Sequence, residues 1–223
     1  MHSVLNKASG YYVDRSMAHS QGKFIVFEGG EGCGKDTQID LLKNRLRDRT
    51  DVIFTREPGG TVAGEEIRSL ILKDRTPALQ PETELLLFLA ARAELMEQVI
   101  RPALDNGKVV ISNRFGLSTI AYQIYGRQRP QLLPLLKEVS EKIVGRYIPH
   151  YLLIDIPPEV GRSRVESRGV LSRFDADSLD FHARVREGYL KNVGMGAESV
   201  IIDGTGSISD VEQKVWDTIE SWT

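Results

Sequence analysis

The sequence FIVFEGGEGCGKDT, residues 24 to 37, places a glycine-rich loop directly after a short apolar run. The loop follows the pattern G-x-x-x-x-G-K-[ST], whose backbone N–H groups bind phosphate and whose lysine reaches the β- and γ-phosphates of a nucleotide. One position departs from the pattern, because Asp36 stands where a serine or threonine hydroxyl normally binds magnesium. The apolar run predicts a strand and the next segment predicts a helix, which is the context that this motif requires.

We expect this loop to bind ATP, because its glycines allow a tight turn whose N–H groups point inward, next to the positive end of a helix. Lys35 is the candidate catalytic cation, and Cys33 is expected to be a small loop residue. An acid is electrostatically costly in an anion-binding loop, so Glu31 is expected to face a sugar hydroxyl of the acceptor. The candidate ATP-binding residues are Gly29, Gly30, Glu31, Gly32, Cys33, Gly34, Lys35, Asp36 and Thr37.

Apolar runs alternate with helical patterns along the rest of the chain. Continuous apolar runs suit strands that are buried on both faces of a parallel sheet. We therefore expect an α/β protein with a three-layer P-loop NTPase fold, in which helices flank a five-stranded parallel sheet and ligands bind beyond the carboxyl ends of the strands. The expected strands are 24–27, 52–55, 109–112, 152–156 and 200–203, and the expected helices include 37–47, 82–104 and about 176–190.

Length and composition limit the classes of protein that fit. The 223 residues suit a single domain at 23–223, preceded by a flexible leader at 1–22 that has no apolar stretch long enough for a signal peptide. A net charge of -2 gives no general attraction to nucleic acid or to a membrane surface. The single cysteine excludes an internal disulfide and suits the cytoplasm, and the longest apolar runs are too short to span a membrane.

Four arginines follow the fourth expected strand. An arbitrary charged run of this kind is normally a solvated helix face followed by a loop. In a phosphate-binding fold, a mobile lid that carries arginines over the substrate is the better interpretation, and we place it at about 162–176. The four residues are Arg162, Arg164, Arg168 and Arg173.

Four further segments accompany the loop in a fixed order: TREPGGT (55–61), LLFLAAR (86–92), NRFGLSTIAYQ (113–123) and SRFDADSLDFHARVREGYL (172–190). With these segments the chain resembles the thymidylate kinases over about residues 23 to 220. The resemblance implies a magnesium-dependent enzyme that transfers the γ-phosphoryl group of ATP to dTMP, giving dTDP for dTTP synthesis. It also implies a homodimer.

Several side chains in these segments suit an acceptor nucleotide. Arg56 follows the second expected strand, where a guanidinium can hold a phosphate by two hydrogen bonds. Phe88 and Arg92 lie four residues apart and hence on one helix face. The resemblance implies that Phe88 stacks on the thymine and that Arg92 bonds its edge. Thr119, Tyr122 and Gln123 match base- and sugar-contacting positions of the family, and Tyr122 is expected to fill the place of a ribose 2′-OH.

Two of the residues expected near the acceptor nucleotide, Glu57 and Arg68, have a second possible role. Glu57 is expected to orient neighbouring arginines and Arg68 to add to the nucleotide site, but either residue could form an ordinary surface salt bridge. The candidate substrate-binding residues are Glu31, Arg56, Glu57, Arg68, Phe88, Arg92, Arg114, Thr119, Tyr122 and Gln123.

Catalysis of phosphoryl transfer depends mainly on positioning and on cations. The resemblance implies that Arg114 bridges donor and acceptor phosphates. Because glycine follows Glu31 in the loop, the second catalytic arginine is expected in the lid, where Arg173 matches the family motif more closely than Arg168. Lys35, Arg114, Arg173 and Arg168 are therefore the candidate catalytic residues.

Two positions depart from the family pattern. Asp36 replaces a serine or threonine, and Asn113 replaces an aspartate at the end of the neighbouring strand. We hypothesise that the carboxylate has moved from strand to loop, so that Asp36 is a metal ligand, Asn113 lies behind it, and the charge around Mg²⁺ is unchanged. In two alternatives, Asp36 repels the nucleotide, or Thr37 binds the metal instead.

Two alternative functions remain open for the whole protein. They are a kinase for another nucleoside monophosphate and a catalytically silent nucleotide-binding protein.

Overall fold

The structure is a computed structural model of the chain, and it describes residues 22–167, 169, 174 and 177–223. Within these residues, five strands form one sheet in the order β2-β3-β1-β4-β5, and every neighbouring pair is parallel. The predicted α/β fold with a five-stranded parallel sheet is confirmed. The strands are β1 (Lys23–Glu28), β2 (Val52–Arg56), β3 (Val109–Asn113), β4 (His150–Asp155) and β5 (Ser199–Asp203).

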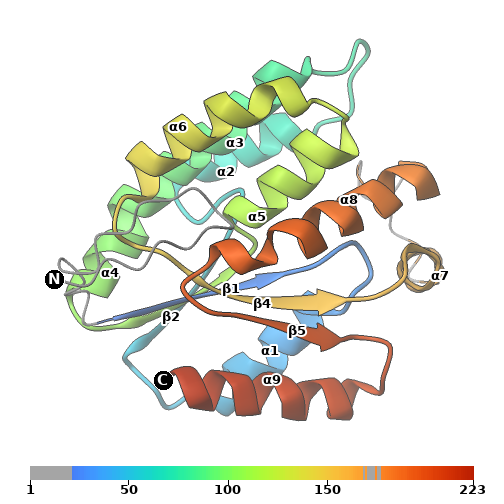
Figure 1. The fold of residues 1–223 in the computed structure, drawn as a ribbon. Coiled ribbons are helices and arrows are strands. Elements are labelled where there is room, and N and C mark those ends of the chain that lie inside the picture. The colour runs from blue at the N-terminus through green and yellow to red at the C-terminus, as the bar shows by residue number, and fades with distance from the viewer. Residues whose placement is uncertain (1–21, 168, 170–173, 175–176) are drawn as a thin grey trace, which may run out of the picture.

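Helices cover both faces of this sheet, with α1 and α9 on one face and α3, α5, α6 and α8 on the other (Figure 1). The α-helices are α1 (Lys35–Arg45), α2 (Val62–Leu72), α3 (Pro81–Leu95), α4 (Arg101–Asp105), α5 (Gly116–Thr119), α6 (Leu133–Val144), α7 (Pro158–Glu166), α8 (Leu179–Asn192) and α9 (Ile208–Trp222). Two π-helical segments, η2 (Met96–Ile100) and η3 (Ile120–Gly126), and two short 3₁₀ segments, η4 (Pro130–Leu132) and η5 (Val193–Met195), complete the described elements.

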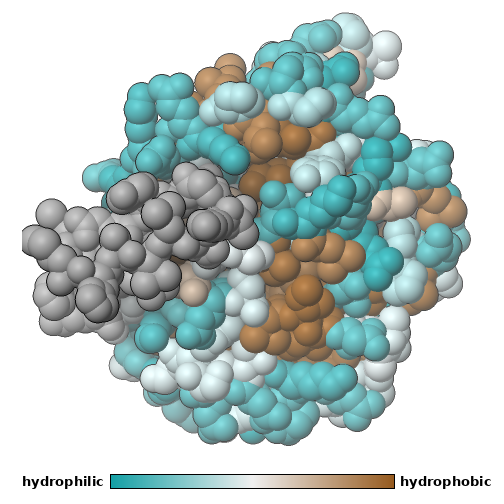
Figure 2. Space-filling model, viewed as in Figure 1, coloured by the Kyte–Doolittle hydropathy of each residue, from teal (hydrophilic) through white to brown (hydrophobic). Residues whose placement is uncertain are grey.

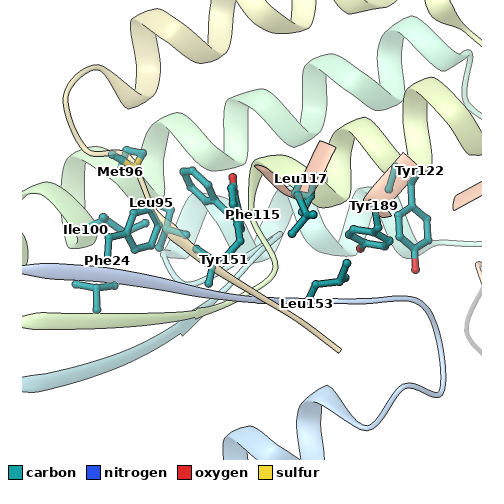
Figure 3. Packing of buried hydrophobic residues seen from close by; sticks show 14 of the residues in the cluster. Phe24, Leu95, Met96, Ile100, Phe115, Leu117, Tyr122, Tyr151, Leu153 and Tyr189 are labelled. Atoms are coloured by element: carbon teal, nitrogen blue, oxygen red, sulfur yellow. The ribbon is translucent and has the colours of Figure 1, made fainter. Parts of the chain in front are cut away.

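Strand residues divide between two cores, because successive side chains point to opposite faces of a sheet. Phe24 and Val26 of β1 pack with residues of α5 and α8, whereas Ile25 and Phe27 pack with residues of α1 and α9. In the first core, Phe24 and Phe115 meet edge-on (Figure 3). Tyr122 and Tyr189 lie side by side at the end of this core, with ring centroids 6.2 Å apart.

All three predicted helices have different bounds in the structure, and the first, expected at 37–47, is α1 at Lys35–Arg45. The segment 82–104 is interrupted by η2 between α3 and α4, and Pro102 at the start of α4 lacks the N–H that would continue the α-helical ladder. The helix expected from about 176 begins at Leu179, because the hydroxyl of Ser178 accepts a hydrogen bond from Phe181 N at 3.2 Å and caps the helix.

The surface seen in Figure 2 is mainly hydrophilic, with hydrophobic residues gathered near its middle. Ile201 on the edge strand β5 is 49% exposed. None of the helices in the described ranges is long and apolar enough to cross a membrane.

Candidate active site

The glycine-rich loop joins β1 to α1 at the carboxyl end of the sheet. Gly32 and Gly34 have positive φ angles of 71° and 95°, and Gly34 is the residue before the first turn of α1. A Cβ on Gly32 would lie 2.3 Å from the carbonyl oxygen of Gly161 in α7. The loop therefore requires glycine for its backbone conformation and for its close approach to α7.

Lys35 turns back into this loop. Its Nζ donates to the carbonyl oxygen of Gly29 at 3.0 Å, and the residue is only 6% exposed. Cys33 is buried in the core between the sheet and α1, as its small side chain allows. The ammonium group is therefore held inside the turn where the loop pattern predicts phosphate oxygens.

A cavity of about 630 Å³ extends from the loop to α2, α3 and η3. It brings together most of the candidate residues from separate segments of the chain. Gly29, Gly30 and Arg92 are not on its wall. The candidates that line it are Glu31, Gly32, Cys33, Gly34, Lys35, Asp36, Thr37, Arg56, Glu57, Arg68, Phe88, Asn113, Arg114, Thr119, Tyr122 and Gln123.

Arg114 lies between the loop and the far end of the cavity. Its guanidinium donates to Glu31 Oε1 at 2.7 Å and to the hydroxyl of Tyr189 at 2.8 Å. The hydroxyl of Tyr122 donates to the same oxygen of Glu31 at 2.7 Å. Burial favours the neutral form of Glu31, but Arg114 and Lys35 outweigh it and lower the pKa of this carboxyl. Glu31 is therefore an anion that faces Arg114 and Tyr122.

Below the far wall of the cavity lies a buried ion pair. Glu57 accepts three hydrogen bonds of 2.7 to 3.0 Å from Arg92, and the two side chains are 4% and 1% exposed. Arg92 also donates to Thr119 Oγ1 at 2.7 Å, whereas its buried Nη1 has no hydrogen-bond partner within the described part of the chain. Arg92 thus holds two wall residues from beneath.

The arginines on the wall are held by carboxylate and carbonyl groups. Arg56 Nη2 contacts both oxygens of Glu65 at 2.8 Å, and Glu65 also accepts a hydrogen bond from Gly60 N. Arg68 Nη1 donates to the carbonyl oxygen of Pro58 at 3.0 Å. Both arginines are among the residues that line the cavity, so this end of it can offer guanidinium groups to an anion.

The two departures from the family pattern are in direct contact. Asn113 Nδ2 donates to Asp36 Oδ1 at 2.5 Å, while the buried Oδ1 of Asn113 has no hydrogen-bond partner in the residues that the structure describes. Among the described residues, no group of three or more His, Cys, Asp or Glu side chains is arranged to hold a metal ion. Magnesium needs few protein ligands when substrate phosphates bind it, and it prefers oxygen. The oxygens of Asp36, Thr37 and Asn113 therefore fit this ion.

The predicted catalytic lid residues Arg168 and Arg173 lie outside the described residues. The first part of the predicted lid, 162–166, is the end of α7. Arg164 in this helix donates to the carbonyl oxygen of Gly204 at 3.0 Å. Arg162 lines a second cavity of about 320 Å³ between α7 and α8.

Four polar residues near the site were not among the sequence-based candidates. Gln123 Nε2 donates to Glu84 Oε1 at 3.0 Å, so Glu84 holds a predicted base-contacting residue. Glu28, Ser118 and Tyr189 form hydrogen bonds beneath Arg114. An acid at the end of an otherwise apolar run, as in FIVFE, is a sequence signal that could have drawn attention to Glu28. Tyr189 has no such signal, because only the fold brings it to Arg114.

A P-loop fold whose cavity joins a phosphate-binding loop to an arginine-lined wall defines a nucleotide-dependent phosphotransferase. The thymidylate kinase family model matches residues 27–215. The chain is similar to the thymidylate kinase of Caulobacter vibrioides, with 42% identity over 203 residues that cover 90% of this chain and 97% of that protein. It is 48% identical to the thymidylate kinase of Carboxydothermus hydrogenoformans over 173 residues, 77% of this chain and 84% of that protein.

A solved structure gives the same result. The crystal structure of thymidylate kinase from Ehrlichia chaffeensis superposes with a TM-score of 0.70 and 31% identity, and the match covers 89% of this chain and 98% of that one. The chain therefore belongs to the thymidylate kinase family. It is an enzyme of the nucleoside monophosphate kinase class.

Proposed function

We propose that the chain transfers the γ-phosphoryl group of ATP to dTMP, giving ADP and dTDP for dTTP synthesis. The observation that carries this proposal is the single cavity that holds Lys35 at one end, Phe88 and Gln123 at the other, and Arg114 between them. Such an arrangement gives a donor phosphate and an acceptor nucleotide a common cavity, and positioning supplies much of the catalysis of phosphoryl transfer.

On the donor side, the loop N–H groups and Lys35 bind the phosphates of ATP. Arg114 bridges the donor and acceptor phosphates, where its charge offsets the charge that develops during transfer. The second catalytic cation is a lid arginine, Arg173 or Arg168, on the strength of the family motif alone.

On the acceptor side, Arg56 and Arg68 bind the phosphate of dTMP. Phe88 stacks on the thymine, while Gln123 and Arg92 bond its polar edge. Arg92 Nη1, which has no hydrogen-bond partner among the described residues, supports this role. Glu31 accepts a hydrogen bond from the sugar, and Tyr122 fills the place of a 2′-OH beside it.

Magnesium is the proposed cofactor, and Asp36 together with Asn113 or Thr37 would supply its protein oxygens. When bound, this ion neutralises charge on the phosphates of ATP. The contact between Asp36 and Asn113 supports a coupled exchange of carboxylate and amide at this site. We also propose, from family membership alone, that the protein is a cytoplasmic homodimer.

The test is a panel of possible acceptors, each assayed with ATP and Mg²⁺. The panel contains dTMP, dUMP, dCMP, dGMP and the ribonucleotide form of TMP. We expect kcat/KM to be highest for dTMP. Equal values across the panel would overturn the choice of acceptor, and nucleotide binding without any dTDP would overturn the activity. The comparisons give no support to another acceptor or to a silent binding protein.

A further inference from the structure

Glu28 is a buried acid at the end of β1 that none of the proposed roles uses. It is 0% exposed and lies directly before the glycine-rich loop. A buried carboxyl group is costly unless its oxygens are hydrogen-bonded. At its position between the first strand and the glycine-rich loop, Glu28 therefore needs hydrogen-bond donors close by.

Three donors satisfy this carboxyl group. Glu28 Oε1 accepts from Phe115 N at 2.9 Å and from Ser118 N at 3.1 Å, and Oε2 accepts from the hydroxyl of Ser118 at 2.5 Å. All three donors belong to the first turn after Arg114. Glu28 thus ties this turn to the strand that leads into the phosphate-binding loop.

The backbone at Arg114 needs such support. Its φ angle of 70° is in the left-handed region, which side chains other than glycine rarely adopt. The N–H of Arg114 donates to Phe27 O at 2.9 Å, and its carbonyl oxygen accepts from the hydroxyl of Ser112 at 2.8 Å. With Glu28 on the following turn, bonds on both sides hold the residue in this conformation.

The hydroxyl of Ser118 extends this hold to the guanidinium. It accepts from Arg114 Nη1 at 3.1 Å and lies 2.7 Å from the hydroxyl of Tyr189. A hydroxyl has one proton and two acceptor positions. When the hydroxyl of Ser118 donates its hydrogen bond to an ionised Glu28, both of its acceptor positions are free for Arg114 and Tyr189.

We propose that Glu28 is a positioning residue for phosphoryl transfer: through Ser118 it fixes the guanidinium of Arg114 at the junction of the donor and acceptor ends of the cavity. This inference rests on the proposed function, because it assigns Arg114 to the transferring group.

The ionisation of Glu28 gives the proposal a distinctive signature. Burial raises the pKa of Glu28 to about 7, against the hydrogen bond from Ser118 and the charge of Arg114, which act to lower it. Among the described residues, the ionisable groups that face it are Arg114 after β3, Arg92 on α3 and Tyr189 on α8. A protonated Glu28 would donate to Ser118 and occupy one of the two positions that Arg114 and Tyr189 use.

The experiment measures kcat and both KM values from pH 6 to 9 for the wild type, Glu28→Gln, Ser118→Ala and the double variant. The amide of Glu28→Gln donates to Ser118 as a protonated acid would. At pH 8 we expect each single variant to lose about tenfold in kcat with KM values within about twofold, and the double variant to lose no more than either. At pH 6 we expect the deficit of Glu28→Gln to shrink to about twofold.

Glu138→Gln is the matched control, because Glu138 lies in an exposed ion pair with Lys142 on α6 and is not among the residues that line either cavity. Its kcat should equal that of the wild type. A Glu28→Gln enzyme with wild-type kcat, a deficit that does not depend on pH, or additive losses in the double variant would overturn the proposal.

Two further controls separate a loss of folding and a different choice of acceptor from the role of Glu28. Circular dichroism checks that each variant is folded; if Glu28→Gln is not, an unchanged kcat in Ser118→Ala overturns the proposal by itself. The ratios are taken with whichever acceptor the wild type phosphorylates best. A wild type that prefers another acceptor than dTMP therefore contradicts the proposed function without deciding the role of Glu28.

Discussion

The two ends of the large cavity are built in different ways. The donor end is one continuous segment, residues 31–37, in which backbone groups and Lys35 form the binding surface. The acceptor end combines side chains from α2, α3 and η3, which the buried pair of Glu57 and Arg92 and the contact of Gln123 with Glu84 hold in place. The donor end should therefore depend on a single side chain, whereas the acceptor end should depend on buried contacts between elements.

The largest effect is expected at the donor end. Lys35→Ala removes the cation inside the loop and should lower kcat by about 10³-fold, with the KM for dTMP within a few-fold of the wild type. Steady-state rates measure this change. Lys43→Ala on the exposed side of α1 is the control and should leave kcat unaltered. A loss below tenfold for Lys35→Ala would show that the loop does not depend on its lysine.

The next effect concerns the stability of the acceptor end. Glu57→Gln leaves the buried guanidinium of Arg92 without its counter-charge and should lower the free energy of unfolding by about 3 kcal/mol. Urea denaturation measures the change. Glu138→Gln breaks an exposed pair and should change stability by less than about 1 kcal/mol. Equal effects of the two variants would mean that the acceptor end does not depend on its buried pair.

A smaller effect should separate binding from chemistry. Gln123→Ala removes a wall side chain that Glu84 orients, and we expect the KM for dTMP to rise about tenfold while the KM for ATP stays the same. Initial rates at varied concentrations of each substrate give both constants. A change confined to the KM for ATP would place Gln123 on the wrong side of the cavity.

The smallest effect tests the metal site at the donor end. Asp36→Thr and Asn113→Asp should each weaken Mg²⁺ use, and the double variant should recover, with a coupling energy of about 1 kcal/mol. Magnesium titrations of the rate and binding of Mn²⁺ to the ATP complex, followed by electron paramagnetic resonance, give two independent readouts. If both single variants behave like the parent and show no coupling, the carboxylate has not been relocated.

The same contrast explains what the sequence could predict. The phosphate-binding loop and the parallel sheet follow from one local motif and from apolar runs, and both are found where expected. That Phe88 and Gln123 line one cavity could be predicted only from the family resemblance, because the two residues lie in different helices and no local sequence pattern joins them.

Other features needed the three-dimensional arrangement. Sequence spacing showed that Asp36 and Asn113 were unusual, but only the pairing of β1 with β3 brings the end of one strand to the loop after the other. The hydrogen bonds that Ser118 donates to Glu28 join residues 90 positions apart. A strand that ends in an acid gives a weak signal, since many strands end in polar residues at a sheet edge.

The most direct measurement of the central claim follows the phosphoryl group itself. ATP labelled at the γ-phosphate is incubated with dTMP, Mg²⁺ and the protein, and the products are separated by chromatography. We predict that the label appears in dTDP and that Lys35→Ala slows this transfer by about 10³-fold. Label that stays in ATP or appears only as inorganic phosphate would contradict the account.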